Sequence, residues 1–258
     1  MDALVVQMDY MFIAPDGTIA ATPEKNSIPV LVAVDDRGAV EACYCTKKGP
    51  TDACAVKEMS EHMETLGVKK LMLQTDGELP IQAVAKHIAK DTVPVVTLRT
   101  TPRYSSQSNG RVEVMNKTLA GTMRTIKGEV DKKCSGQLDW TKCLLPWLVR
   151  HCAWIQTKFK TQTDGHSAYY RVTRAEYQGE VVPFAEIVMA KMPNNTKLNP
   201  SKLAPRWVRA VWLGRSSVSD EHMVGCETGV WSTRTVRRLA NENQWDEQML
   251  KRCIDVPW

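Results

Sequence analysis

Residues 70–77 read Lys-Leu-Met-Leu-Gln-Thr-Asp-Gly, an apolar run that ends in an acidic turn. A short apolar run bounded by turn residues is typical of a strand. Before this run, Thr51–Leu66 has the composition of a helix, and Gly67 is suited to end that helix. After the run, Pro80–Lys90 is expected to form a second helix, with the proline near its first turn. A strand flanked by helices indicates crossover connections, and therefore favours an α/β layer fold.

Strand-like runs continue the pattern on both sides of this segment. They lie at Ala3–Tyr10, Ile28–Val34, Ala39–Cys45 and Val93–Leu98. The second run is almost continuously apolar, as expected of a strand that is covered on both faces. Asp35 and Asp36 supply the turn chemistry that leads into the third run. The order β-β-β-α-β-α-β predicts an antiparallel meander extended by crossover-connected strands.

The second half of the chain begins with a polar loop over residues 100–110 and a helix after it. That helix carries one apolar stripe, formed by Val112, Met115, Leu119, Met123 and Ile126. Trp140–Phe159 is a further helix, which Pro146 kinks or starts. Lys191–Asn199 has the composition of a linker, and Arg206–Leu239 contains short alternating stretches that indicate a small β module. Residues 191–240 hold nine Lys/Arg against three Asp/Glu, a balance of +6.

Composition excludes several classes of protein. The 258 residues are 43% apolar and 24% charged, as in folded soluble proteins, and the net charge of +5 is compatible with a polyanionic partner. No apolar run is long enough for a membrane span, and no secretory signal is visible. Because none of the eight cysteines forms a C-x-x-C pair, we expect no structural zinc and read all eight as reduced, mostly core residues of an intracellular protein.

Three acids stand where rigid elements could hold them against a cleft. Asp9 ends the first strand, Asp76 ends the fourth, and Glu113 lies in the first turn of the helix after the polar loop. An acid at such a position is more often a turn or cap residue. If the three carboxylates converge, however, their repulsion would be relieved by a pair of Mg²⁺ or Mn²⁺ ions, which suits an in-line phosphoryl displacement.

Two strings carry a family resemblance. Residues 75–78 read Thr-Asp-Gly-Glu, and residues 104–119 read Tyr-Ser-Ser-Gln-Ser-Asn-Gly-Arg-Val-Glu-Val-Met-Asn-Lys-Thr-Leu. Together they resemble the catalytic core of retroviral and long-terminal-repeat retrotransposon integrases, above all the copia type. Gly165-His166-Ser167-Ala168-Tyr169, Phe184-Ala185-Glu186 and Trp212-Leu213-Gly214 resemble downstream family segments. The resemblance is strongest over residues 70–127, and the family's N-terminal zinc module has no counterpart.

The resemblance implies an α/β fold: an RNase H-like core with a five-stranded mixed sheet and flanking helices, followed by a small, basic, β-rich C-terminal module. The implied parts are the catalytic core at 1–130, a helical extension of it at 131–190 and the basic module at 191–258. The implied activity is metal-dependent strand transfer, which joins the 3′ ends of element DNA to target DNA. The metal-binding catalytic acids are Asp9, Asp76 and Glu113.

The remaining expectations concern partners. The DNA contacts carried over from the family are Arg103, Tyr104, Gln107, Asn109, Asn116, Lys117 and Arg124. The alternative role for Lys117 is a solvent-exposed salt bridge to a neighbouring residue of the same helix. Glu78 is either an auxiliary acid of the site or a solvent-exposed residue at the start of a helix. We also expect a homo-oligomer and no membrane partner, and the family resemblance implies nuclear localisation.

Three alternatives to the integrase reading stay open. The first is an RNase H-like nuclease of the same fold, which normally clusters a fourth carboxylate. The second is a decayed or domesticated copy that binds DNA without cutting it. The third is covalent recombination through Tyr104, Ser105 or Ser106, for which no paired base or arginine cluster is evident.

Overall fold

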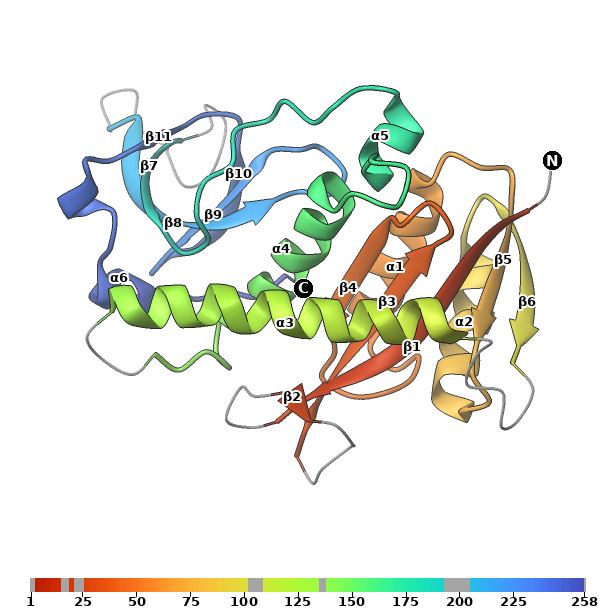
Figure 1. The fold of residues 1–258 in the computed structure, drawn as a ribbon. Helices are drawn as coiled ribbons and strands as arrows, with labels where there is room; N and C mark the ends of the chain where they lie inside the picture. The colour runs from red at the N-terminus through yellow and green to blue at the C-terminus, as the bar shows by residue number, and fades with distance from the viewer. Residues whose placement is uncertain are drawn as a thin grey trace. The chain divides into compact units, whose positions relative to one another are not determined.

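The computed structural model describes residues 3–14, 19–20, 26–101, 109–134, 138–192 and 205–257 (Figure 1). The chain forms two compact units, each built from two segments: residues 1–123 with 152–178, and residues 124–151 with 179–258. The sequence predicts three consecutive parts divided at residues 130 and 190, and that division stays a prediction. Each unit is described by itself below.

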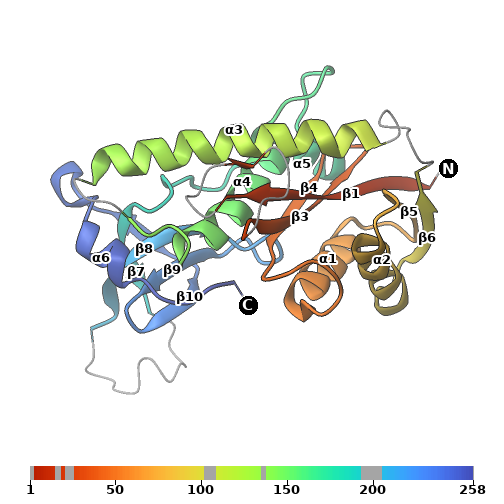
Figure 2. The same cartoon turned by 90° about the horizontal axis from the view of Figure 1, so that it is seen from below.

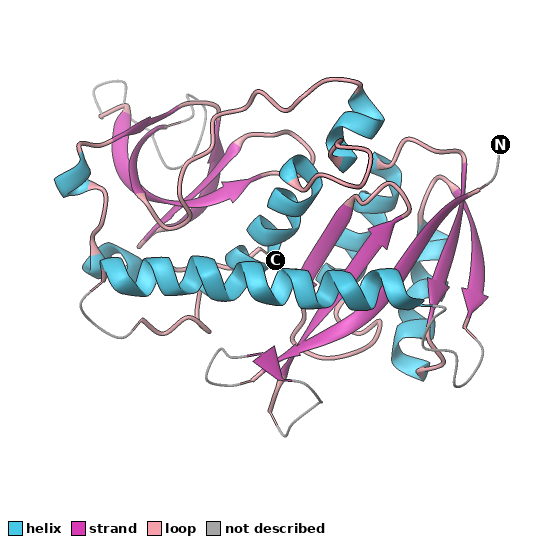
Figure 3. Ribbon diagram, in the orientation of Figure 1, coloured by secondary structure: helices cyan, strands magenta, loops and turns pink. Residues whose placement is uncertain are grey.

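The first unit is built on a mixed sheet, drawn in magenta in Figure 3. Its strand order is β4-β3-β1-β5-β6, and the two-residue β2 pairs with β1. The bounds are β1 Leu4–Ile13, β2 Ile19–Ala20, β3 Ile28–Asp35, β4 Val40–Tyr44, β5 Lys70–Thr75 and β6 Val95–Thr100. Neighbours β1, β3 and β4 run antiparallel, whereas β5 runs parallel to β1 and β6 to β5. The expected five-stranded mixed sheet is confirmed, with β2 added to it.

Two crossover helices cover one face of this sheet, as Figure 2 shows. α1 (Ala53–Thr65) joins β4 to β5, and α2 (Leu79–Asp91) joins β5 to β6. The Asp52 side chain caps α1 by accepting from the Ala55 backbone amide at 3.2 Å. Alternate residues of the central strands point toward these helices, and the resulting apolar core includes Met8, Leu71, Leu73, Met59, Met63, Ile81 and Ile88. Burial of these side chains is the main force that holds the sheet and the two helices together.

Three helices follow β6: α3 (Gly110–Lys133), α4 (Leu144–Phe159) and α5 (Ala168–Thr173). Four members of the expected α3 stripe, Val112, Met115, Leu119 and Met123, are buried. The C-terminal part of α4 belongs to the first unit, where the Thr157 hydroxyl accepts from the Val40 backbone amide at 2.8 Å. α4 begins at Leu144, so Pro146 lies in its first turn, where a missing backbone donor costs little. The helix therefore starts later than Trp140, and Pro146 marks its start.

The second unit holds a five-stranded antiparallel sheet with the order β10-β9-β8-β7-β11. Its strands are β7 Ile187–Lys191, β8 Trp207–Arg215, β9 His222–Cys226, β10 Gly229–Thr233 and β11 Val236–Arg238, followed by the short helices η2 (Asn241–Asn243) and α6 (Glu247–Arg252). The small β module expected after Arg206 is confirmed. β7 belongs to the same sheet although it lies within the stretch expected to be helical. Its sequence, Ile-Val-Met-Ala-Lys, is too short to distinguish strand from helix by periodicity, and pairing with β8 decides it.

All eight cysteines are free thiols, and six of them are buried, which agrees with the expectation of reduced core residues. The two less buried ones are Cys54 on α1 and Cys226 on β9. Within the ranges given above, none of the helices is both long and apolar enough to cross a lipid bilayer.

Candidate active site

The strand register places two of the predicted catalytic acids side by side. In the parallel pairing of β1 with β5, Gln7 lies opposite Gln74. Two residues further along each chain are Asp9 and Asp76, and side chains two apart in a strand share one face. Asp76 immediately follows the last residue of β5, where the backbone leaves the sheet. The two carboxylates therefore lie at neighbouring positions, on the face of the sheet opposite to α1 and α2.

Asp9 is half-buried, and both of its carboxylate oxygens accept hydrogen bonds. Oδ1 accepts from the Tyr10 backbone amide at 2.8 Å, and Oδ2 accepts from Asn116 Nδ2, on α3, at 3.3 Å. Burial is the largest cause that raises the pKa of Asp9 from 3.8 to about 6, against the lowering effect of the Tyr10 amide. The charges of Asp76, Glu78 and Glu113 raise that pKa further. Acids from β1, the β5–α2 turn and α3 are thus close enough to act on one another.

Glu113 is positioned by a residue that the sequence alone did not single out. Gln7 Oε1 accepts from the backbone amides of Arg111 at 3.0 Å and Val112 at 3.2 Å. These are among the first amides of α3, which have no partner inside the helix. A glutamine on β1 therefore caps α3 from a distance of more than 100 residues in the chain and fixes the turn that carries Glu113. The feature of the sequence that could have pointed to Gln7 is its position as a polar residue within an apolar strand, two residues before Asp9.

The turn after β5 is held by its own side chains. Asp76 Oδ1 accepts from the Glu78 backbone amide at 3.0 Å, which closes the turn at the start of α2. Glu78 is exposed, and its carboxylate pairs with Lys48 Nζ at 2.6 Å. Lys48 also lies 4.8 Å from the centre of the Phe12 ring, a cation–π distance. Glu78 is therefore an exposed residue at the helix start that pairs with Lys48, and its charge still reaches Asp9.

The chemistry of the three acids suits a hard divalent cation, but their present arrangement is not a finished metal site. Carboxylate oxygens are the ligands that Mg²⁺ and Mn²⁺ prefer. The mutual charge effects on Asp9 show that a cation would relieve repulsion here. Among the residues that the structure describes, however, no three His, Cys, Asp or Glu side chains lie close enough together to hold a metal ion. Binding would have to draw the carboxylates inward.

The expected DNA contacts divide into three groups. Arg103, Tyr104 and Gln107 lie outside the described residues. Asn109 is buried directly before α3, whereas Asn116 bonds to Asp9 and therefore lies with the acids. Lys117 and Arg124 are exposed on α3, and Arg124 falls in the segment assigned to the second unit.

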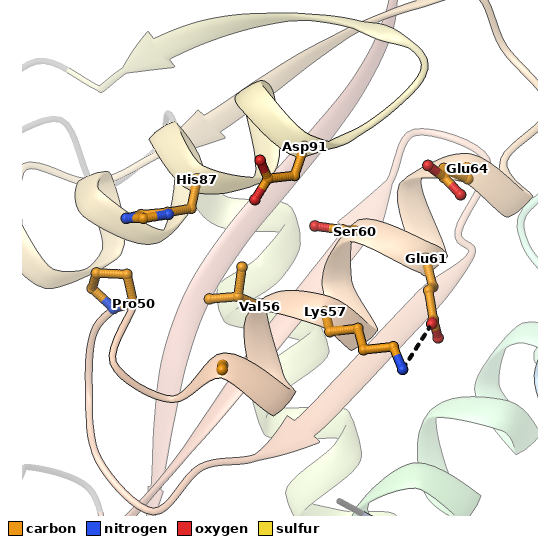
Figure 4. Close-up of a pocket in the computed structure, with 9 residues that line it drawn as sticks. Pro50, Val56, Lys57, Ser60, Glu61, Glu64, His87 and Asp91 are labelled. Carbon is orange, nitrogen blue, oxygen red and sulfur yellow. Dashed lines mark ion pairs between the residues drawn. The ribbon is translucent and has the colours of Figure 1, made fainter.

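A separate cavity of about 410 Å³ lies between α1 and α2 (Figure 4). Ser60 and Asp91 extend toward it from the two helices, and Lys57 pairs with Glu61 at 3.7 Å beside it. The residues that line it are Pro50, Ala53, Val56, Lys57, Ser60, Glu61, Glu64, His87 and Asp91. None of the predicted site residues is among them, and the α1/α2 face is the opposite side of the sheet from Asp9. The hollow is therefore not part of the acidic site.

Comparison with solved structures finds distant likenesses, of which two are to retroviral proteins. The first is to a chain of the simian T-cell lymphotropic virus intasome, solved by cryo-electron microscopy in complex with PP2A regulatory subunit B56 gamma. It has 13% identity and a TM-score of 0.49, and covers 92% of this chain and 78% of that one. The second is to the catalytic core domain of BIV integrase, with 17% identity and a TM-score of 0.43 over 66% of this chain and 93% of that one. No protein-family model and no curated protein matches the sequence. At these scores neither likeness supports a conclusion about this chain, and the proposals below rest on its own residues.

Proposed function

We propose that the chain is a metal-dependent DNA strand transferase, the integrase of a copia-type retrotransposon. The observation that carries the proposal is geometric: the register of β1 with β5 places Asp9 beside Asp76, and Asn116, about one turn after Glu113 on α3, donates to Asp9. Three acids on separate rigid elements are an arrangement that a phosphoryl-transfer site requires. The two sequence strings that resemble integrases contain two of these acids.

Asp9, Asp76 and Glu113 would hold a pair of Mg²⁺ or Mn²⁺ ions. Such a pair, when bound, activates an attacking hydroxyl and stabilises the leaving oxygen. In strand transfer, the 3′-hydroxyl oxygen of element DNA bonds to a target phosphorus. The bond from that phosphorus to the target's 3′-oxygen breaks, and that oxygen leaves with a proton.

The chain's own residues orient this site. Asn116 donates to Asp9 Oδ2 and holds one rotamer of that carboxylate. Gln7 fixes the first turn of α3 and with it the direction of Glu113. Lys117 is exposed one helical turn after Glu113, where a phosphate contact would place the DNA backbone beside the acids.

The second unit offers a basic surface for the same partner. Pairing of β11 with β7 and of β7 with β8 puts Arg237, Met189 and Arg209 in one row across the sheet. The Arg237 guanidinium lies 4.6 Å from the centre of the Trp207 ring. The side chains that alternate with this row, such as Val188 and Ala210, are buried in the apolar core of the unit. This row therefore faces outward and can contact phosphates without regard to base sequence.

A strand-transfer assay on a labelled oligonucleotide duplex tests the proposal. Asp76→Asn keeps the side-chain volume but removes the charge, so we expect it to abolish product with Mg²⁺ and with Mn²⁺ while the protein stays folded. Asp91→Asn is the matched control, because Asp91 is exposed at the end of α2. Ca²⁺ should support DNA binding without turnover, since it accepts looser coordination.

The outcomes separate the remaining readings. Wild-type activity from a folded Asp76→Asn protein would refute the assignment of the acids. Turnover in EDTA would favour a covalent nucleophile such as Tyr104. Binding without strand transfer under every metal condition would identify a DNA-binding protein that has lost catalysis, and cleavage of an RNA–DNA hybrid would identify an RNase H-like nuclease. The homo-oligomer and the nuclear localisation are proposed together with the integrase assignment, and a result that refutes the assignment removes their support.

A further inference from the structure

Two thiols in the second unit lie against each other although 110 positions separate them in the chain. Cys143 immediately precedes α4, and Cys253 immediately follows α6. Their sulfur atoms are 3.4 Å apart, with the Cys143 thiol donating toward Cys253 Sγ. A disulfide requires about 2.05 Å between sulfurs, so the two atoms need to approach by only about 1.3 Å.

The local packing holds both thiols in place. Cys143 Sγ also lies 3.1 Å from the Asp255 carbonyl oxygen, and Trp147 Nε1 donates to that same oxygen at 3.2 Å. The start of α4 therefore anchors the chain segment that carries Cys253. On its other side, Cys253 Sγ lies so close to Gly225 that a Cβ added there would be 2.7 Å away. Neither sulfur has room to turn far from the other.

A hollow gives small molecules access to the pair. Both cysteines line a cavity of about 250 Å³ in the second unit, together with Leu138, Asp139, Lys142, Leu144, Leu250 and Lys251. A volume of this size admits molecules of a few heavy atoms. The sulfurs themselves are largely covered, so a bulky reagent would reach them less readily than a small one.

We propose that Cys143 and Cys253 form a redox-convertible pair, which a small hydroperoxide oxidises to a disulfide that fastens the C-terminal segment to the start of α4. One sulfur attacks a peroxide oxygen, and the O–O bond breaks to give a sulfenic acid. The hydroxide that leaves takes up the thiol proton and becomes water. The second sulfur then attacks the first, the S–O bond breaks, and a second water leaves with the remaining thiol proton. The two electrons come from the two cysteines and reduce the peroxide.

The resting state and the competing thiols agree with this assignment. The hydrogen bond from Cys143 and burial hold the pKa of Cys253 far above its usual value, so Cys253 rests as a thiol near neutral pH. The nearest competitor is Cys226 on β9, whose sulfur lies 3.0 Å from the Thr228 hydroxyl. Cys43 lies on β4 and Cys45 directly after its last residue, and the Cys45 thiol lies 3.5 Å from the Cys43 carbonyl oxygen. The Cys226 and Cys45 sulfurs are thus held by contacts to oxygen atoms, whereas the Cys143 and Cys253 sulfurs contact each other.

Treatment of the reduced, full-length protein with hydrogen peroxide, followed by mass spectrometry of tryptic peptides, tests the proposal directly. We expect one linked peptide that contains Cys143 and Cys253 and lacks two hydrogen atoms, and we expect a thiol reductant to release it. The bond closes a long loop, so the oxidised protein should unfold several degrees above the reduced one. Cys143→Ser should remove both effects, whereas Cys54→Ser, a matched control on α1, should keep them.

Two results would overturn the assignment. One is a linked peptide that joins Cys253 to Cys226. The other is stepwise oxidation of Cys54 or Cys226 while Cys143 and Cys253 stay reduced. Both are read from the wild-type protein, so they remain decisive if the Cys143→Ser variant fails to fold.

Discussion

Replacement of Asp9 by asparagine should stabilise the folded protein while it destroys strand transfer. The pKa of Asp9 is about 6 in the folded chain, against an ordinary value of 3.8 for the unfolded chain. Between these two pH values the folded state holds a proton on Asp9 that the unfolded state has already lost. Stability from this group is therefore present below about pH 3.8 and is lost as the pH rises through about 6. Two pKa units correspond to about 3 kcal/mol, and partial exposure of the side chain reduces this to about 1–2 kcal/mol.

The local hydrogen bonds make asparagine a good substitute for protonated Asp9. An asparagine oxygen can still accept from the Tyr10 amide. Asn116 now presents its Nδ2 to Asp9, so its amide must turn over to accept from the new amide through Oδ1, an atom that is buried and has no hydrogen-bond partner within the described chain. The gain in stability should therefore come from the lost charge, with little loss of contacts.

Urea unfolding of wild type and Asp9→Asn at about pH 8 and about pH 4.5 measures the effect. We expect the variant to be more stable by about 1–2 kcal/mol at the higher pH, and the difference to shrink at the lower one. Asp91→Asn, an exposed acid in the same unit, should show no such pH-dependent gain. A variant that is less stable than wild type at the higher pH, or a gain of equal size at both, would refute the electrostatic reasoning. Added Mg²⁺ should raise the stability of wild type only.

Three further changes test other parts of the structure. Gln7→Ala removes the acceptor for two amides of α3 and should lower stability by about 1–2 kcal/mol. It should also lower the rate of strand transfer by more than this loss of stability explains, whereas the control Gln82→Ala on α2 should have neither effect. Arg237→Gln should lower the slope of DNA affinity against salt by about one ion, measured from dissociation constants at several salt concentrations; an unchanged slope would remove the outer row of the second sheet from the interface. Burial lowers the pKa of His62 to about 4, so stability should fall as the pH drops from about 6.5 toward 4, and His62→Gln should flatten that fall in urea titrations.

Much of the first unit could be predicted from local pattern. Apolar runs bounded by turn residues located β3 and β5, and the helical stretches between runs implied the parallel crossovers that the structure contains. Asp76 and Glu113 were found in the same way, because one follows the end of a strand and the other lies at the start of a helix. Asp9 was expected at the end of the first strand, but β1 continues to Ile13, so Asp9 lies within the strand. Local rules work here because burial and turn chemistry act on neighbouring residues.

Pattern could not supply the contacts that complete the site. Nothing near Gln7 in the chain announces that it caps α3, because its partners, the amides of Arg111 and Val112, follow about 100 residues later. Asn116 was expected to face DNA, and only the packing of α3 against β1 brings it to Asp9. β7 was missed for a related reason, since five residues become a strand only when β8 and β11 pair with them.

Sequence alone therefore determined the element order, the α/β class of the first unit and which acids are candidates for catalysis, because these depend on residues close together in the chain. Tertiary structure decided how the acids act on one another. The pKa of Asp9 depends on burial and on charges from β1, the β5–α2 turn and α3 at once. The contact between Cys143 and Cys253 likewise exists only after α4 and the C-terminal segment have packed together. Electrostatic and thiol chemistry depend on distance in space, and the fold sets that distance by joining parts of the chain that the sequence keeps far apart.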